Sequence, residues 1–404
     1  MPAVTSAGTP VRVLIVSHSY YEEDPRVRRE AEALVAAGFA VDVLGLRMPG
    51  SSASECVDGV QVHRLPVQRH QGAGIRTYLA EYAEFFGRVA LAAVPLHARR
   101  HYSLAQVATL PDPLVFALAP LRLDGVPVVI DLHEAMPEFF RSRFPAASRR
   151  VVWVSLLAAE RASIVFASHV LTVNDALRDR LTALGVSPSK VTVVLNSPRS
   201  DRFDPTAYPA RAFMAGGRLR LVYAGALTPL YQLEVAVEAL ARLARGQDGP
   251  ALDVTLDLYG RGDAEPRLRD AAAALSVADR VTFHGRIPVE AVPGKMAAAD
   301  VGLAPTRRDP FTDFSLSTKI FEYAAMGKPV VASRLPTVQR YFGEALCYFE
   351  PGDAASLGAV IRRVAMEPSY REKVVSAAAE RVRGLSWERE AARYVALIRE
   401  LGRD

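Results

Sequence analysis

A lysine and a glutamate stand close together in the segment FSLSTKIFEYAAMGKPVVAS, which covers residues 314–333. In a helix, Lys319 and Glu322 would share one face, since residues three apart are neighbours on a helix surface. Free backbone N–H groups and the helix dipole favour anions at a helix start, and a lysine adds a positive charge. The pattern therefore indicates anion binding, and a local ion pair on a solvated helix face is the alternative.

The residues around this pair predict the elements that position it. Ser315, Ser317 and Thr318 are typical of a helix start, because their hydroxyls can accept hydrogen bonds from free N–H groups. Gly327 stands where a helix would end in a left-handed residue, and an apolar run follows directly. The segment is therefore predicted to run from loop to helix to strand.

The rest of the chain repeats this alternation of apolar runs and helical segments. The run VRVLIVSH at 11–18, the helical segment at 26–38 and the run VDVLGL at 41–46 predict a βαβ unit. Similar units follow up to a last predicted helix at 387–401. Continuous apolar strands are typical of a parallel sheet that helices cover on both faces.

One segment interrupts the alternation and predicts a boundary between domains. Residues 197–218 are rich in Pro, Arg, Asp and Gly and lack periodicity, so we expect a linker there. The predicted fold class is α/β, with two doubly wound, Rossmann-like domains at 1–200 and 217–385. A C-terminal helix at about 386–404 is expected to pack back on the first domain. Ligands should bind at the carboxyl ends of the strands, in a cleft between the domains.

Composition narrows the class of protein. The chain has 404 residues, half of them apolar, which is enough for domains with real cores. Its net charge is +5, but the basic and acidic residues are interleaved, which argues against a nucleic-acid partner. Cys56 and Cys347 lie far apart and match no metal-binding or disulfide pattern. A reducing compartment is therefore expected.

Two segments bear on membrane association. The N-terminus lacks a basic region before its apolar run, so no signal peptide is predicted. The apolar window at 151–173 carries two charged residues and a histidine, which is too polar for a spanning helix. We expect a cytoplasmic protein. Peripheral contact with the inner membrane face stays open through residues 77–102. That segment mixes aromatics with arginines, and an amphipathic helix packed on a core is the alternative.

Several motifs, in their order along the chain, resemble glycosyltransferase family four, the retaining GT-B enzymes. They are FSLSTKIFEYAAMGKPVVAS, DLHEAMPEFF, LYGRG, RVTFHGRIP and SWEREAARY. Together with DPRVRREAEAL, the TKIFEY motif resembles a bacterial branch that acts in surface-polysaccharide or glycoconjugate pathways. The resemblance implies transfer of a sugar from a nucleotide-sugar donor, most of all a UDP-sugar. The C-terminal domain would hold the donor, and the N-terminal domain a glycan, lipid-linked or small-molecule acceptor.

The resemblance also implies roles for individual residues. Glu322 matches the residue that grips the donor ribose, His133 the residue near the reacting carbon, and Lys319 is the third catalytic candidate. The implied donor-binding residues are Gly225, Gly260, Arg261, Arg286, Ile287, Arg308, Asp313, Phe314, Ser315, Leu316, Ser317 and Thr318. The candidates on the acceptor side, which follow strands of the first domain, are His18, Asp24, Arg26, Asp112 and Glu134.

The sequence departs from the family pattern at three places. Phe314 stands where the family has the first of two paired glutamates, and HSYYEEDPRVRR replaces a glycine pair after the first strand. The basic residues that commonly hold the diphosphate fall on Ala226 and Tyr231. The donor phosphates would therefore need positive charge from elsewhere in the chain.

The chemistry of the leaving group indicates which residues could supply it. Breaking a sugar–diphosphate bond builds negative charge on the phosphate, which a metal, a helix N-terminus or a fixed cation can stabilise. No aspartate pair of the DxD type follows a predicted strand, so metal-independent transfer without a cofactor is predicted. The candidate cations are Lys319, Arg261, Arg286 and Arg308.

Two other functions stay open. A non-hydrolysing sugar-nucleotide epimerase on the same fold would need acid and base groups, for which Glu134, Glu138 and His133 are the visible candidates. A catalytically weak auxiliary subunit of another glycosyltransferase would fit the missing basic residues. Donor hydrolysis by the purified protein separates transferase from auxiliary, and isomerisation of a sugar nucleotide would indicate the epimerase.

Overall fold

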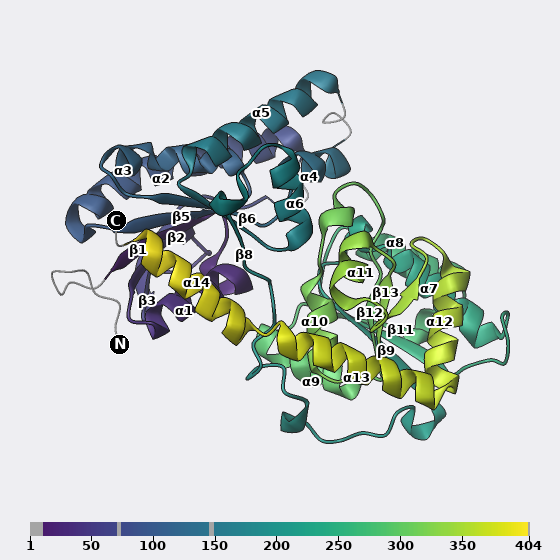
Figure 1. The fold of residues 1–404 in the computed structure, drawn as a ribbon. Coiled ribbons are helices and arrows are strands. Elements are labelled where there is room, and N and C mark those ends of the chain that lie inside the picture. Colours follow the sequence, from purple (N-terminus) through teal and green to yellow (C-terminus); the bar gives the residue numbers. More distant parts are fainter. Residues whose placement is uncertain (1–10, 71–73, 145–148, 403–404) are drawn as a thin grey trace. The chain divides into compact units, whose positions relative to one another are not determined.

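The computed structural model describes residues 11–70, 74–144 and 149–402 of the chain, which folds into two units (Figure 1). Unit 1 runs up to Asn196 and also contains the residues from Arg389 onward. Unit 2 spans Ser197–Glu388, so the segment predicted as a linker lies within it.

Unit 1 is built on an eight-stranded sheet in the order β3-β4-β2-β1-β5-β6-β7-β8. Neighbouring strands are parallel except β3 and β4. The strands are β1 (Arg12–Ser17), β2 (Ala40–Leu46), β3 (Ser54–Val57), β4 (Val60–Leu65), β5 (Leu104–Ala108), β6 (Val128–Leu132), β7 (His169–Thr172) and β8 (Val191–Val193). The parallel core of this sheet confirms the predicted α/β class.

The antiparallel edge is a feature that the expectation of a parallel sheet missed. Strands β3 and β4 form a hairpin joined by Asp58 and Gly59, whose φ angles are 50° and 83°. A two-residue turn with both φ angles positive matches the right-handed twist of the strands, and Asp-Gly is a preferred pair for it. The dipeptide was therefore a readable signal in the sequence.

Helices cover both faces of the first sheet (Figure 1). On one face, α2 and α5 pack over a core that includes Val16, Phe85 and Ile130. On the other face lie α1 and the C-terminal helix α14, whose Tyr394 reaches the central strand β5. The helices are α1 (Pro25–Ala36), α2 (Ile75–Arg100), α3 (Ala119–Leu123), α4 (Met136–Arg143), α5 (Arg150–Phe166), α6 (Asp175–Ala183) and α14 (Trp387–Leu401), and the short 3-10 turns include η2 (Asp112–Leu118).

Unit 2 holds a six-stranded, fully parallel sheet in the order β11-β10-β9-β12-β13-β14. Its strands are β9 (Leu219–Ala224), β10 (Val254–Tyr259), β11 (Val281–Gly285), β12 (Val301–Ala304), β13 (Val330–Ser333) and β14 (Cys347–Phe349). Strands β10 and β11 extend the sheet on one side of β9, and β12, β13 and β14 extend it on the other side, so the strand order reverses between β9 and β12. In sheets of this kind, ligands bind at the carboxyl ends of the strands at that point.

Alternate residues of the second sheet face two separate apolar layers. Leu221 and Tyr223 belong to the layer under α7, α8 and α12, whereas Val222 and Ala224 belong to the layer under α9, α10, α11 and α13. This burial on both faces explains the continuous apolar runs of the strands. The helices are α7 (Leu233–Arg245), α8 (Glu265–Ala274), α9 (Val292–Ala298), α10 (Thr318–Ala325), α11 (Pro336–Phe342), α12 (Ala354–Met366) and α13 (Pro368–Gly384).

The segment that carries Lys319 and Glu322 folds as its sequence predicts. Helix α10 occupies Thr318–Ala325, Gly327 adopts a φ of 65° beyond its end, and β13 follows at Val330–Ser333. Among the described residues, no helix is long and apolar enough to cross a membrane. Cys56 is exposed and Cys347 is buried, and both are free thiols.

Candidate functional site

Three glycines mark the carboxyl ends of β9, β10 and β11 in unit 2. The Gly225 N–H donates to the Tyr259 carbonyl at 2.8 Å, and the Gly260 N–H donates to the Gly285 carbonyl at 2.8 Å. The loops after the three strands are thus bound to one another through their backbones. Such a bound set of loops presents main-chain groups to a ligand in a fixed arrangement.

The approach of two of these loops leaves no room for a side chain. A Cβ on Gly260 would lie 1.8 Å from the Gly225 carbonyl oxygen, and the φ of Gly260 is 145°. A Cβ on Gly262 would lie 2.1 Å from the Leu227 carbonyl oxygen. Glycine is required at both positions, because any other residue would overlap the backbone of the neighbouring loop.

Lys319 points into this group of loops. Its side chain is buried, and its Nζ lies 4.2 Å from the ring centroid of Tyr231 and 5.1 Å from that of Tyr223. A Cβ on Gly225 would lie 2.8 Å from both Cε and Nζ, so the ammonium sits directly against that glycine. The burial rules out a solvated helix face. Contacts of this kind hold a cation through the negative faces of the rings.

Tyr231 is one of the two residues that replace basic residues of the family pattern. It stands where a basic residue is expected, and its ring carries the Lys319 ammonium instead. Tyr223 is fixed in turn, since its hydroxyl donates to the Ala226 carbonyl at 2.8 Å. A positive charge is therefore present beside these loops, although it comes from α10.

The start of α10 was predicted to be capped by serine or threonine hydroxyls, and this was wrong. Ser317 is the N-cap residue, but its side chain makes no capping hydrogen bond. The Ser315 hydroxyl donates to the Phe311 carbonyl at 3.3 Å instead. The first N–H groups of the helix are thus not satisfied by a capping hydroxyl, which suits them to an anion.

Tyr323 fixes α10 against the sheet one turn beyond Lys319. Its hydroxyl accepts from the Ala224 N–H at 3.1 Å and donates to the Val222 carbonyl at 3.3 Å. A Cβ on Gly302 would lie 2.3 Å from the Tyr323 ring, so this glycine makes room for the tyrosine. Glu322, between Lys319 and Tyr323 on the chain, is half-buried.

The remaining donor-binding candidates lie in the loops that follow strands of unit 2 and at the first residue of α10. Arg308 forms an exposed ion pair with Asp313, with a distance of 3.2 Å between Nε and Oδ1. The Asp313 carbonyl also accepts from the Thr337 hydroxyl, which ties the loop to α11. Arg261 and Arg286 are exposed, and the half-buried candidates are Ile287, Phe314, Ser315, Leu316, Ser317 and Thr318. Their roles toward a donor stay predictions.

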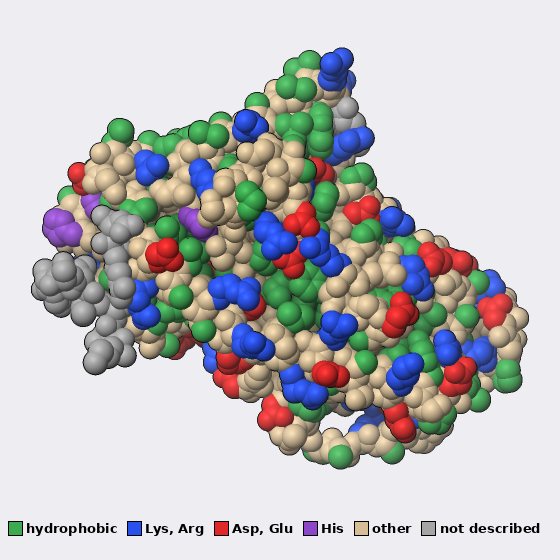
Figure 2. Space-filling model, viewed as in Figure 1, with side chains coloured by type: hydrophobic (Ala, Val, Ile, Leu, Met, Phe, Trp, Pro, Cys, Tyr) green, Lys and Arg blue, Asp and Glu red, His purple; other side chains and the backbone are tan. Residues whose placement is uncertain are grey.

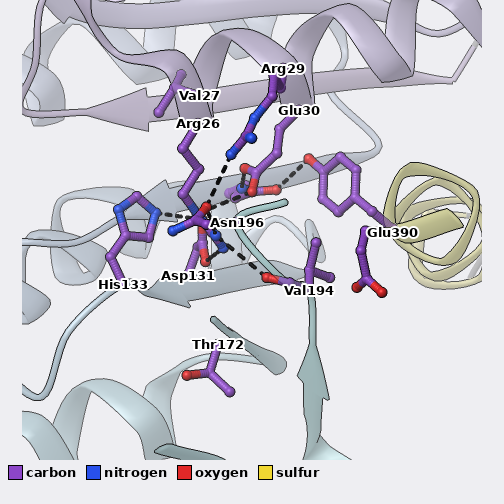
Figure 3. A network of polar contacts seen from close by, with 12 residues as sticks. Arg26, Val27, Arg29, Glu30, Asp131, His133, Thr172, Val194, Asn196 and Glu390 are labelled. Atoms are coloured by element: carbon purple, nitrogen blue, oxygen red, sulfur yellow. Dashed lines mark hydrogen bonds and ion pairs between the residues drawn. The ribbon is translucent and has the colours of Figure 1, made fainter. Parts of the chain in front are cut away.

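His133 lies in unit 1, after β6, and is held by a buried ion pair (Figure 3). Its Nε2 is 2.7 Å from Oδ2 of Asp131, which is fully buried. Arg26 of α1 binds the same carboxylate with two nitrogens, at 2.5 and 3.0 Å. Burial by itself would raise the pKa of Asp131, but Arg26 and His133 together lower it below its usual range. Asp131 is therefore an ionised acceptor that orients the imidazole.

Two acceptor-side candidates, one buried and one half-buried, have structural contacts within unit 1. His18 is buried, and burial followed by the charge of Arg69 lowers its pKa to about 3, so it is neutral. Its Nε2 lies 3.0 Å from Oε1 of Glu81. Asp24 is the N-cap of α1, where its carboxylate accepts from the N–H groups of Arg26 and Val27. Their roles toward an acceptor stay predictions.

The other two candidates differ in exposure. Asp112 is fully buried, and neither of its carboxylate oxygens has a hydrogen-bond partner among the residues that the structure describes. Burial, reinforced by Glu160, raises its pKa well above the usual value, which favours the protonated form. Glu134 is half-buried, and desolvation raises its pKa against the influence of His133. Of the two, only Glu134 has access to solvent.

Sequence reasoning missed Asp131 as a site residue and with it the link between Arg26 and His133. The signal was present, because an aspartate inside the apolar run VVIDL would be buried and would need a cationic partner. The identity of that partner depends on the fold. In residues 11–70, 74–144 and 149–402, no group of three or more His, Cys, Asp or Glu side chains has a metal-binding arrangement.

Comparison with known families identifies the class of protein. Residues 24–197 match the family described as "Glycosyl transferase 4-like domain", and residues 218–367 match "Glycosyl transferases group 1". The chain belongs to glycosyltransferase family four. This glycosyltransferase is 27% identical to a D-inositol 3-phosphate glycosyltransferase of Geodermatophilus obscurus, over 90% of this chain and 81% of the relative. It is 26% identical to a glycogen synthase of Mycobacterium tuberculosis, over 92% and 90% of the two chains.

Solved structures show the same fold for this glycosyltransferase. The sucrose-phosphate synthase of Thermosynechococcus elongatus superposes with a TM-score of 0.79 at 21% identity, covering 97% of this chain and 99% of the other. The Anabaena protein HepE in complex with UDP-glucose gives a TM-score of 0.70 at 15% identity, covering 96% and 99%. The predicted GT-B fold is thereby confirmed.

Proposed function

We propose that this glycosyltransferase moves a sugar from a UDP-sugar donor to a hydroxyl of a sugar-containing or lipid-linked acceptor, with retention of anomeric configuration and without a metal ion. The observation that carries the proposal is the position of Lys319. A buried ammonium lies against Gly225 and beside the uncapped start of α10, at the carboxyl ends of parallel strands. Diphosphate oxygens are the complementary ligand for such a group of donors.

The reaction needs this positive charge at the leaving group. The bond between the anomeric carbon and the phosphate oxygen breaks, and its electron pair stays on the diphosphate. The acceptor oxygen bonds to the same carbon, and its proton passes to the departing phosphate. Lys319 and the α10 N–H groups would stabilise the developing charge, Glu322 would accept from the ribose hydroxyls, and His133 would contact the sugar near the reacting carbon.

A binding and cleavage experiment in the presence of EDTA tests the proposal. Among UDP, GDP, ADP and dTDP, UDP is expected to raise the melting temperature most, since a ligand at a hundred times its dissociation constant stabilises by about 2.7 kcal/mol. UDP-glucose with EDTA is then expected to be hydrolysed slowly, and proton NMR should detect the α-anomer of glucose first.

Each alternative function predicts a different outcome of this experiment. Cleavage that stops with EDTA and returns with magnesium would contradict a metal-independent reaction, and release of the β-anomer would contradict retention. Isomerisation of the sugar nucleotide would indicate an epimerase. Nucleotide binding without cleavage or transfer for any of the sugar nucleotides would indicate an auxiliary subunit.

We also infer that unit 1 contacts an anionic membrane through α2, α3 and α5. Large apolar side chains are exposed on these helices, with 79% exposure at Leu91, 89% at Leu123 and 78% at Val151. Figure 2 shows hydrophobic side chains along the upper edge, over these helices. Exposed arginines flank them, including Arg99 and Arg150. Apolar groups bordered by cations suit the interface of an anionic lipid surface.

Vesicle sedimentation checks this surface. The protein is expected to sediment with phosphatidylglycerol vesicles and not with phosphatidylcholine vesicles, because the arginines need anionic headgroups. The double variant Leu91→Asp with Val151→Asp should stay in the supernatant. Met366→Asp is the matched control, since Met366 is 59% exposed on α12 of unit 2. Equal sedimentation of the double variant and the control would remove these helices from the membrane contact.

A further inference from the structure

A chain of buried polar contacts continues behind the ion pair that holds His133 (Figure 3). Glu30 Oε1 lies 3.2 Å from Nε of Arg26, one turn earlier on α1. Glu30 Oε2 accepts from the Gln106 side-chain amide at 2.7 Å, and the Gln106 oxygen accepts from the Tyr394 hydroxyl at 2.7 Å. The contacts therefore join α14 to α1 through the central strand β5.

The helix that supplies Tyr394 is bound to unit 1 at further points. Glu390 accepts from the Leu195 N–H at 3.0 Å, and the Arg393 guanidinium donates to the Val193 carbonyl at 3.3 Å. Tyr394 itself is fully buried. Helix α14 is thus held against the end of β8, and this fixes the position of the Tyr394 side chain.

The charges of this network cost more free energy than packing alone would require. Glu30 and Asp131 are both fully buried, and the Arg26 guanidinium lies between them. Well-packed apolar side chains in such a place would be as stable or more stable. The network leads to His133, whose side chain is 19% exposed. The network of buried charges therefore ends at an imidazole that a sugar could reach.

We propose that Glu30, Gln106 and Tyr394 are positioning residues, which together with Arg26 fix Asp131 against His133 and so orient the imidazole for glycosyl transfer. The inference rests on the proposed function of His133. According to this proposal, α14 affects the chemistry of unit 1 although none of its side chains touches the reacting atoms. Arg26 is shared by the two carboxyl groups, so the loss of either one would let the guanidinium and Asp131 shift.

The protonation of Glu30 supports the proposal. Burial, followed by the charge of Asp131, raises its pKa to about 7, while Arg26 and His133 oppose the shift. The groups that face Glu30 are Arg26 on its own helix, Asp131 and His133 from β6 and its loop, and the neutral Tyr394 hydroxyl of α14. Glu30 is therefore neutral below about pH 7, and above it a second negative charge stands beside Asp131.

Two near-isosteric variants test the network in the full-length protein. Glu30→Gln and Tyr394→Phe are each expected to shift the His133 imidazole resonances and to lower kcat for UDP-glucose hydrolysis about tenfold, with KM within about twofold. Wild-type kcat should rise with pH through a midpoint near 7 as Glu30 ionises, and Glu30→Gln, which resembles neutral Glu30, should lack this rise. Tyr348→Phe is the control, because it removes a buried hydroxyl of unit 2 that donates to Val338.

The outcomes separate this inference from the proposed function. Unchanged His133 resonances and kcat in both variants would reduce the network to a structural role and overturn the inference. A loss of kcat in Tyr348→Phe as large as in Tyr394→Phe would do the same. A wild-type protein without turnover would refute the proposed function, while the His133 resonances would still decide whether Glu30 and Tyr394 position the imidazole.

Discussion

Lys319→Ala is expected to lower the turnover of the donor by about a hundredfold, comparable to the loss of one oxyanion donor. The Lys319 ammonium is the buried cation against Gly225, and the basic residues of the family pattern are missing at Ala226 and Tyr231. Its removal leaves the diphosphate without this buried cation. The affinity for free UDP should fall less than kcat does, because the charge on the leaving group grows in the transition state.

Two further substitutions at this position separate charge from packing. Lys319→Met keeps an apolar stem beside the rings of Tyr223 and Tyr231 but removes the charge, so it should be about as inactive as alanine. Lys319→Arg should recover little activity, since a planar guanidinium does not replace a compact ammonium in a confined place. Near-normal turnover in Lys319→Ala, with a collapse in Arg308→Ala or Arg286→Ala, would assign the phosphate role to an arginine.

Gly260→Ala should destabilise unit 2 by about 3 kcal/mol or more and abolish nucleotide binding. The added Cβ would lie 1.8 Å from the Gly225 carbonyl oxygen, and the φ of 145° is itself unfavourable for alanine. The backbone of one loop must move, which separates the main-chain groups at the ends of β9 and β10. Urea unfolding measures the change in free energy, and titration with UDP measures the loss of the site.

Gly327→Ala is the matched control for this prediction. Its φ is 65°, and no atom lies within 4 Å of the position that its Cβ would take. It should cost only the strain of a left-handed alanine, about 1–2 kcal/mol, and leave UDP binding intact. If Gly260→Ala were no more costly than Gly327→Ala, the loops would have room to separate and would not define a rigid site.

The elements of both sheets could be read from the sequence to a large extent. Helix α10 and strand β13 are formed by residues whose local preferences agree with their place in the fold, from Thr318 to Ser333. The hairpin at Asp58 and Gly59 was overlooked, although its turn signal is local. The Ser317 hydroxyl was expected to cap α10 and does not, because a serine at an N-cap has other rotamers and partners available.

The candidate site was predictable only where it lies within one stretch of chain. Glycines at strand ends and a lysine at a helix start are local patterns, and both occur at the ends of the unit 2 strands. The burial of His18 and Asp112, by contrast, depends on which helices cover the edge of the first sheet. Position after a strand indicates an edge of the sheet, but it does not tell whether a side chain there faces a ligand or the core.

Periodicity, strand composition and turn residues are properties of neighbouring residues, so the amino-acid order alone determined the α/β alternation and the loops that bear glycine. The GT-B family was indicated by the resemblance of its motifs. Contacts between distant residues needed the folded chain. Tyr231 takes the place of a basic residue because packing brings the Lys319 ammonium over its ring. Glu30 and Tyr394 meet through Gln106 because β5 lies between α1 and α14. Each of these pairs is joined by burial and geometry, which no local preference encodes.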